Sequence, residues 1–193
     1  MTPARLFLLF NAKIDTFMAC SQTLSGIQND CAANMGGIKE VYLANKEDVA
    51  SITVTSNKIT AITMASTAKF KKYAFRPNTS SMSSNYQVNQ ENGIAYVQTD
   101  LLMVFNRMET TKRVEVVAMA QGELIALVRD CNGLLWLLGE ENPLIISAGD
   151  GLTGTARTDR NGYSVTLQDN FSEMPHEVLE GTGGVDLSAI VAA

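Results

Sequence analysis

Apolar and polar residues alternate along most of this chain, and helical spacing is rare. Residues 52–55 alternate before a turn at 56–58, and residues 59–64 continue the alternation after it. A period of two residues is typical of a strand with one buried face. This stretch therefore predicts a β-hairpin.

Three Asn-Gly pairs predict further hairpins: Asn92-Gly93, Asn132-Gly133 and Asn161-Gly162. Both residues tolerate the positive φ that a tight two-residue turn needs. The pairs join residues 85–88 to 94–105, 124–128 to 134–138, and 153–157 to 163–167. Hairpins at this spacing predict a mainly β chain, a β-sandwich or barrel built from hairpins with one flanking α-helix.

Two of the predicted strands, 101–105 and 134–138, are apolar on both faces. Such strands are buried on both sides in folded proteins. Each therefore needs a cover on its second face, and the sequence leaves open whether a helix or another subunit supplies it.

Residues 110–121 interrupt the β pattern. A face formed by Val114, Val117, Ala118 and Gln121 repeats at helical spacing, and Gly122 follows as a C-terminal stop. We expect the flanking helix here, with the side chain of Thr110 or Thr111 capping its start.

Residues 77–92 carry no charge before Glu91 and are rich in Ser and Asn. A flexible loop is one interpretation. The other is a projecting arm that orders against a partner, because long structureless loops are uncommon in compact domains.

The two ends of the chain differ from its middle. Arg5 and the apolar residues 6–10 resemble a short export signal, and residues 17–20 resemble a lipidation site at Cys20; alternatively, translation starts at Met18. From residue 169 onward the chain has five acids and no Lys or Arg, which indicates a solvated tail or a segment that docks on a neighbour. The predicted organisation is an N-terminal appendage (1–17), a β domain with an arm (18–168, arm 77–92) and an acidic, Gly-containing C-terminal segment (169–193).

Composition narrows the function classes. The 193 residues are 46% hydrophobic, enough for a real core, and their net charge is −5. An acidic balance argues against a protein that grips duplex DNA. No apolar run approaches the roughly 20 residues needed for a membrane-spanning helix.

Catalytic chemistry finds little support in the residues present. Any histidine-dependent nucleophile would have to use His176, the only histidine, which follows Pro175 in the acidic segment. The cysteines, Cys20, Cys31 and Cys131, lack the spacing of a structural zinc site. We therefore expect no catalytic residues, no metal and no cofactor, and we do not expect an enzyme.

One basic and aromatic run, residues 69–76, has two interpretations. Lysines beside aromatic rings are typical of single-stranded nucleic-acid binding. Alternatively, the run is a strand with Phe70 in the core and Lys69 and Lys71 facing solvent or an acidic neighbour, for which the acidic tail of another copy has the right sign.

Several short stretches together resemble a known family: residues 31–38, 41–43, 130–139 and 154–163, with the Asn-Gly turns between them. Over roughly residues 18–178 the chain is similar to structural proteins of tailed bacteriophages that infect Bacteroidetes, and above all to the tail tube (major tail) protein type.

The resemblance implies a virion protein, assembled in the cytoplasm of the host bacterium. Its copies would form rings, usually hexameric, whose inner sheets join around a lumen, and the rings would stack into a tube. DNA would pass through without specific binding, and other tail proteins would be partners. The expected self-assembly interface comprises Met82, Tyr86, Val88, Tyr96, Lys71 and Lys72. The alternatives are a head–tail connector or other ring component, and an exported lipoprotein β-domain that binds a glycan or peptide.

Overall fold

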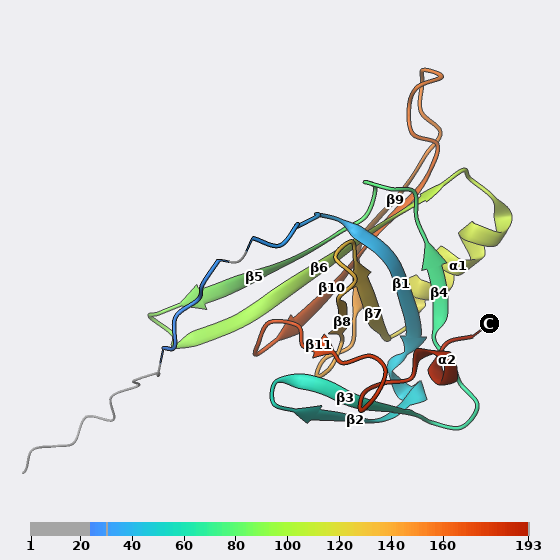
Figure 1. Cartoon of the computed structure of the whole chain (residues 1–193). Coiled ribbons are helices and arrows are strands. Elements are labelled where there is room, and N and C mark those ends of the chain that lie inside the picture. Colours follow the sequence, from blue (N-terminus) through green and yellow to red (C-terminus); the bar gives the residue numbers. More distant parts are fainter. Residues whose placement is uncertain (1–23, 30, 193) are drawn as a thin grey trace, which may run out of the picture. The chain divides into compact units, whose positions relative to one another are not determined.

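The computed structural model describes residues 24–29 and 31–192 (Figure 1). Residues 34–192 form one compact unit, and the described residues before it form no helix or strand. The unit is mainly β, with two sheets and few helices, so the predicted fold class is confirmed. The predicted appendage, residues 1–17, lies outside the described residues.

The larger sheet has seven strands in the order β2-β3-β11-β8-β7-β1-β4. Its strands are β1 (Ile38–Asn45), β2 (Val49–Thr55), β3 (Lys58–Met64), β4 (Lys71–Ala74), β7 (Leu124–Asp130), β8 (Leu135–Leu138) and β11 (Glu177–Val178). A short 3₁₀ helix, η1 (Lys46–Asp48), connects β1 to β2. Only β11 and β3 pair in parallel in this sheet.

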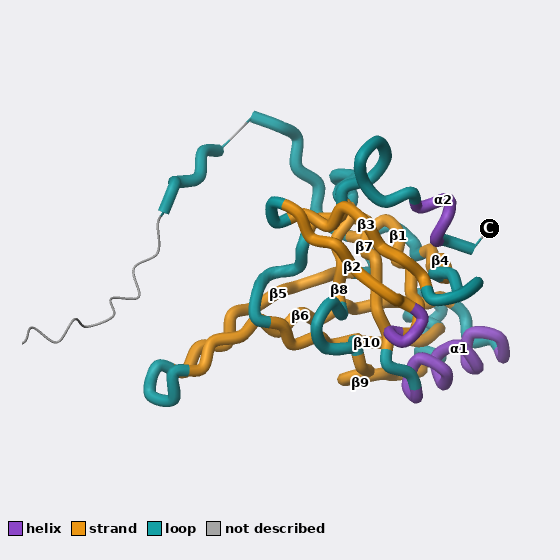
Figure 2. Tube along the Cα trace, turned by 90° about the horizontal axis from the view of Figure 1, so that it is seen from below, coloured by secondary structure: helices purple, strands orange, loops and turns teal. Residues whose placement is uncertain are grey.

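The smaller sheet has four antiparallel strands in the order β5-β6-β10-β9. They are β5 (Ser81–Asn89), β6 (Ile94–Asn106), β9 (Ile145–Leu152) and β10 (Gly162–Phe171). The last pair between β10 and β6 is Phe171 with Val97, so β5 and β6 continue beyond it as a two-stranded ribbon (Figures 1 and 2). We call residues 86–96 the ribbon tip.

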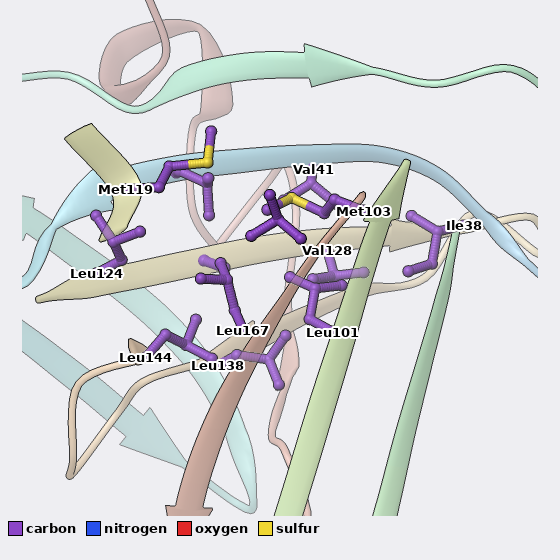
Figure 3. Close-up of a cluster of buried hydrophobic side chains, with 13 residues drawn as sticks. Ile38, Val41, Leu101, Met103, Met119, Leu124, Val128, Leu138, Leu144 and Leu167 are labelled. Atoms are coloured by element: carbon purple, nitrogen blue, oxygen red, sulfur yellow. The ribbon is translucent and has the colours of Figure 1, made fainter. Parts of the chain in front are cut away.

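The main core lies between the two sheets (Figure 3). Val41 and Val128 from the larger sheet meet Leu101, Met103 and other apolar residues of the smaller one. The alternation read from the sequence places these side chains on one face of each strand. The face of the smaller sheet that points inward is therefore the one that carries Leu101, Met103, Val165 and Leu167.

A second core covers the opposite face of the larger sheet. There the side chains of Leu127 and Leu137 pack with Val178, Val185 and Ile190 from the C-terminal segment, which we define as residues 172–192. This segment contains β11 and the short helix α2 (Leu187–Ile190). The second face of the predicted strand 134–138 is thus covered by the chain itself, without another subunit.

The predicted helix is present as α1 (Thr110–Gln121), followed by Gly122. The predicted cap was wrong. The N-cap is Glu109, and no side chain caps the helix. The buried side chain is Met119, while Val114 and Val117 are 55% and 47% exposed. The β-branched valines repeat at helical spacing, but the helix packs through the neighbouring face.

The hairpins follow the predicted turns with one exception. Ser56 and Asn57 both have positive φ between β2 and β3, as do Gly93 and Gly133 in their turns. Asn161-Gly162 is not a hairpin turn, because β9 ends at Leu152 and a loop spans 153–161. The Asp159 carboxylate accepts hydrogen bonds from the N–H groups of Thr155 and Ala156, which closes this loop locally.

Candidate assembly surfaces

The outer face of the smaller sheet is open and mostly polar. Paired residues of neighbouring strands point to the same side, so the neighbours of the inward Leu101 and Leu167 point outward. The central outward side chains are polar at Ser83, Asn85, Gln87, Gln98, Asp100, Thr166 and Gln168, and apolar at Leu102 and at Ile145, which is 53% exposed. Neither cluster of buried hydrophobic side chains lies on this face, in contrast to the face of the larger sheet that the C-terminal segment covers.

The charge of the smaller sheet is one-sided. None of its four strands contains a Lys or Arg, and the acids within them are Asp100, Asp150 and Asp169. Asp150 forms an ion pair at 2.8 Å with Arg160, which lies in the loop between β9 and β10. Hydrogen bonds from Ser164 and Arg160 lower the pKa of the Asp150 carboxyl. The strands of the smaller sheet therefore carry no positive charge that could bind a polyanion such as DNA.

Among the described residues, neither edge strand of the smaller sheet, β5 or β9, has a partner on its outer side. β5 contributes nine residues and β9 contributes eight, and β9 is exposed along most of its length. Unpaired edge backbone is a template for pairing with another chain. Because the four strands alternate in direction, β9 of one copy beside β5 of another would continue the antiparallel order.

The expected interface residues of the arm divide between buried and exposed positions. Residues 81–89 form β5, so most of the predicted loop or arm is a paired strand within its own chain. Met82 is half-buried and packs on the main core. Tyr86 and Val88 are 60% and 62% exposed, and Tyr96 is 37% exposed on the opposite face of the ribbon. Ile94, which the sequence analysis missed, joins them at 48%.

The basic run forms the edge strand β4, as its second interpretation predicted. Phe70 is fully buried, and Lys71 and Lys72 are exposed. Lys72 pairs with Glu40 at 2.8 Å, and this hydrogen bond with that from the Tyr42 hydroxyl lowers the pKa of the Glu40 carboxyl. Lys71 forms no ion pair with any of the described residues. Of these two lysines, Lys72 is therefore already paired within its own chain, and Lys71 could form an ion pair with another copy.

A groove lies between α1 and β4, which the sequence analysis did not predict. It consists of two hollows of about 170 and 250 Å³ that share Tyr73 and Glu115. The Tyr73 hydroxyl donates a hydrogen bond to Glu115 at 3.1 Å, and burial raises the pKa of that hydroxyl. We call this feature the α1–β4 groove. Its lining includes Lys69, Lys71, Lys72 and Lys112, against Asp48 and Glu115.

A cluster of half-buried polar groups contains Lys46, Glu140 and His176. Lys46 donates to the carbonyls of Gly139 and Glu140, and burial lowers the pKa of its amine. The side chain of His176, in the acidic segment, is 13% exposed, and its Nδ1 lies 2.7 Å from the carboxylate of Glu140. These groups connect η1, the β8–β9 loop and the C-terminal segment, which gives them a structural role.

The remaining chemistry of the described residues is sparse. Cys31 and Cys131 are free thiols, and Cys20 lies outside the described residues. Within the described part of the chain, no three His, Cys, Asp or Glu side chains are grouped to hold a metal ion, and no helix is long and apolar enough to cross a membrane. Comparison with protein-family models, curated proteins and solved structures finds no match to this chain.

Proposed function

We propose that this protein is a self-assembling structural protein of a phage virion, whose copies join through the smaller sheet into rings that stack as a tail tube. The observation that carries the proposal is the smaller sheet itself. It has an open and mostly polar face, two edges without a partner among the described residues, and strands without Lys or Arg. The resemblance to tail tube proteins supplies the biological setting.

Ring formation would follow from the geometry of the two edges. They are different strands on opposite sides of one sheet, so joining β5 of one copy, through its residues 81–85 outside the ribbon tip, to β9 of the next is a head-to-tail contact. A head-to-tail contact that closes on itself produces a ring. The joined sheets would then form one continuous wall, and its main-chain hydrogen bonds would need no particular side chain at the edge.

The outer face suits the lining of a DNA conduit. Protein–DNA affinity rises with the number of phosphates that Lys and Arg neutralise. On the outer face, amide and hydroxyl side chains lie beside Asp100 and beside the ion pair of Asp150 with Arg160, whose positive charge is thereby neutralised. A lumen of this composition would let DNA pass without holding it.

The test is assembly of the purified full-length chain, measured by mass photometry and negative-stain microscopy. We expect rings or stacked tubes, and no retardation of duplex DNA in a gel at physiological salt. Single rings that never stack would favour the head–tail connector. A strictly monomeric protein at high concentration and moderate salt would contradict the proposal.

An edge variant locates the contact. Ala148→Lys places a charge on the exposed β9 edge, where lysine disfavours strand pairing. We expect this variant to remain monomeric. Ser51→Lys, on the exposed edge strand β2 of the larger sheet, is the matched control and should assemble as the parent does.

A further inference from the structure

We propose that the ribbon tip of one copy docks into the α1–β4 groove of a second copy, and that this contact stacks one ring on the next. This inference rests on the proposed function and names the partner surface of the ribbon. It predicts which residues stop stacking while leaving ring formation intact.

The two surfaces lie at opposite ends of the unit formed by residues 34–192. The ribbon tip projects from one end, and α1 with β4 lies at the other, in both views (Figures 1 and 2). The tip therefore cannot reach the groove of its own chain. Two different surfaces at opposite ends make a contact that repeats from copy to copy and builds a stack.

The tip presents side chains that are unusual on a surface without a partner. Tyr86, Val88, Ile94 and Tyr96 are exposed within one short ribbon, on its two faces. Tyrosines carry much of the binding energy in protein interfaces because they bury a large area with few rotatable bonds. The tip is thus equipped to insert into a groove and contact both of its walls.

The groove has the shape for side chains of this kind. The larger hollow, of about 250 Å³, is lined by Phe105, Val116 and the ring of Tyr73. Each hollow is smaller than the roughly 300–1,000 Å³ of a typical ligand pocket. A tyrosine or an aliphatic side chain from a neighbouring copy suits it better than a small-molecule ligand does.

The charges of the two surfaces are complementary. Residues 77–106, which contain the ribbon, carry Glu91 and Asp100 and no Lys or Arg. The groove has more lysines than acids along its lining, and neither Lys69 nor Lys71 forms an ion pair with the described residues. Glu91 lies in the turn of the tip, where its carboxylate would meet these ammonium groups.

The acidic C-terminal segment, the other partner expected for the basic strand, is held within its own chain. Glu180 forms two hydrogen bonds with Arg129, at 2.9 and 3.0 Å, and Glu177 pairs with Lys58 at 2.8 Å. These carboxylates are therefore not free to bind β4 of another copy. Among the described acidic segments, the ribbon tip is the one that projects from the unit.

A charge exchange tests the contact in the full-length protein. Glu91→Lys and Lys71→Glu should each raise the protein concentration needed for tube formation by about tenfold or more, because like charges would then meet. The double variant Glu91→Lys/Lys71→Glu should restore stacking. Tube length is measured by negative-stain microscopy and ring mass by mass photometry.

Two matched controls carry the same charge changes elsewhere. Glu141→Lys and Lys39→Glu alter exposed residues without ion pairs among the described residues and outside the groove, so both should stack normally. Rings that stack equally well in both single variants would overturn this inference and leave the proposed function standing. The same holds if the double variant fails to regain stacking. If the parent protein formed no rings, the result would instead contradict the proposed function, on which this inference rests.

Discussion

Both faces of the larger sheet are covered by the chain itself, whereas the smaller sheet has one covered face and one open face. The larger sheet packs against the smaller sheet on one side and against the C-terminal segment on the other. Its strands include Lys39, Lys58, Lys71, Lys72 and Arg129, whereas the strands of the smaller sheet have no basic residue. The faces of the larger sheet therefore stabilise the folded chain, whereas the outer face of the smaller sheet is not covered by the described residues.

The C-terminal segment marks this difference most clearly. Its residues Val178, Val185 and Ile190 are almost fully buried, so an acidic and glycine-rich stretch contributes to the core. On the smaller sheet no comparable segment exists among the described residues. Burial of apolar area therefore stabilises both faces of the larger sheet within one chain, whereas the smaller sheet keeps one face and two edges uncovered by the described residues.

The largest expected effect contrasts one aromatic residue from each region. Phe70→Ala removes a fully buried ring from the second core and should lower the free energy of unfolding by about 3–5 kcal/mol. Tyr86→Ala removes a ring that is 60% exposed and should change it by less than about 0.5 kcal/mol. Urea denaturation of the monomeric Ala148→Lys background measures both. A loss of comparable size at Tyr86 would show that the ribbon is part of the monomer core.

Sequence reasoning predicted the fold because its evidence was local. Alternation along residues 52–64 and the turns at Asn92 and Asn132 depend only on backbone geometry and on side-chain period. The turn predicted at Asn161 was wrong because its side chain and carbonyl instead hold the chain after β6, at Arg107 and Met108. That partner is more than fifty residues away and leaves no local signal.

The candidate surfaces were less accessible from sequence. The exposed tyrosines of the ribbon followed from the hairpin, and the absence of Lys and Arg between residues 77 and 106 was readable although its significance was missed. The α1–β4 groove was not readable, because it depends on how Tyr73 and Glu115 approach each other in the folded chain. The cover of β8 by residues 178–190 was likewise a long-range packing outcome.

A smaller effect is expected where arginine ties the C-terminal segment to the larger sheet. Arg129 is 17% exposed and binds both carboxylate oxygens of Glu180, a geometry that lysine cannot reproduce. Arg129→Lys should therefore lower the free energy of unfolding by about 1 kcal/mol. Arg160→Lys, at the exposed pair with Asp150 on the smaller sheet, is the matched control and should change it by less than about 0.5 kcal/mol. Equal losses of unfolding free energy in the two variants would show that the ion pair on the larger sheet stabilises the fold no more than the one on the smaller sheet does.

The smallest effect concerns Asp169, which links the two sheets. It lies on β10 and is 4% exposed, and its Oδ2 accepts a hydrogen bond from the N–H of Gly139, after β8, at 2.7 Å. Its Oδ1 has no hydrogen-bond partner among the residues that the structure describes. Burial raises the pKa of this carboxyl, despite the opposing effects of the Gly139 hydrogen bond and the nearby Lys46.

The sign of the pH dependence follows from that direction. With a raised pKa, the folded protein binds the proton more tightly than the unfolded chain does, so this group's contribution to stability is lost as pH rises from the ordinary pKa through the raised one. Asp169→Asn keeps an oxygen for Gly139 and cannot ionise. We expect the free energy of unfolding of the parent to fall relative to that of the variant as the pH rises above the ordinary pKa of an aspartate, about 3.9. If the unfolding free energies of the two proteins, measured by urea denaturation, changed with pH in the same way, ionisation of Asp169 would not affect stability. The contact between the two sheets would then not depend on the protonation of this carboxyl.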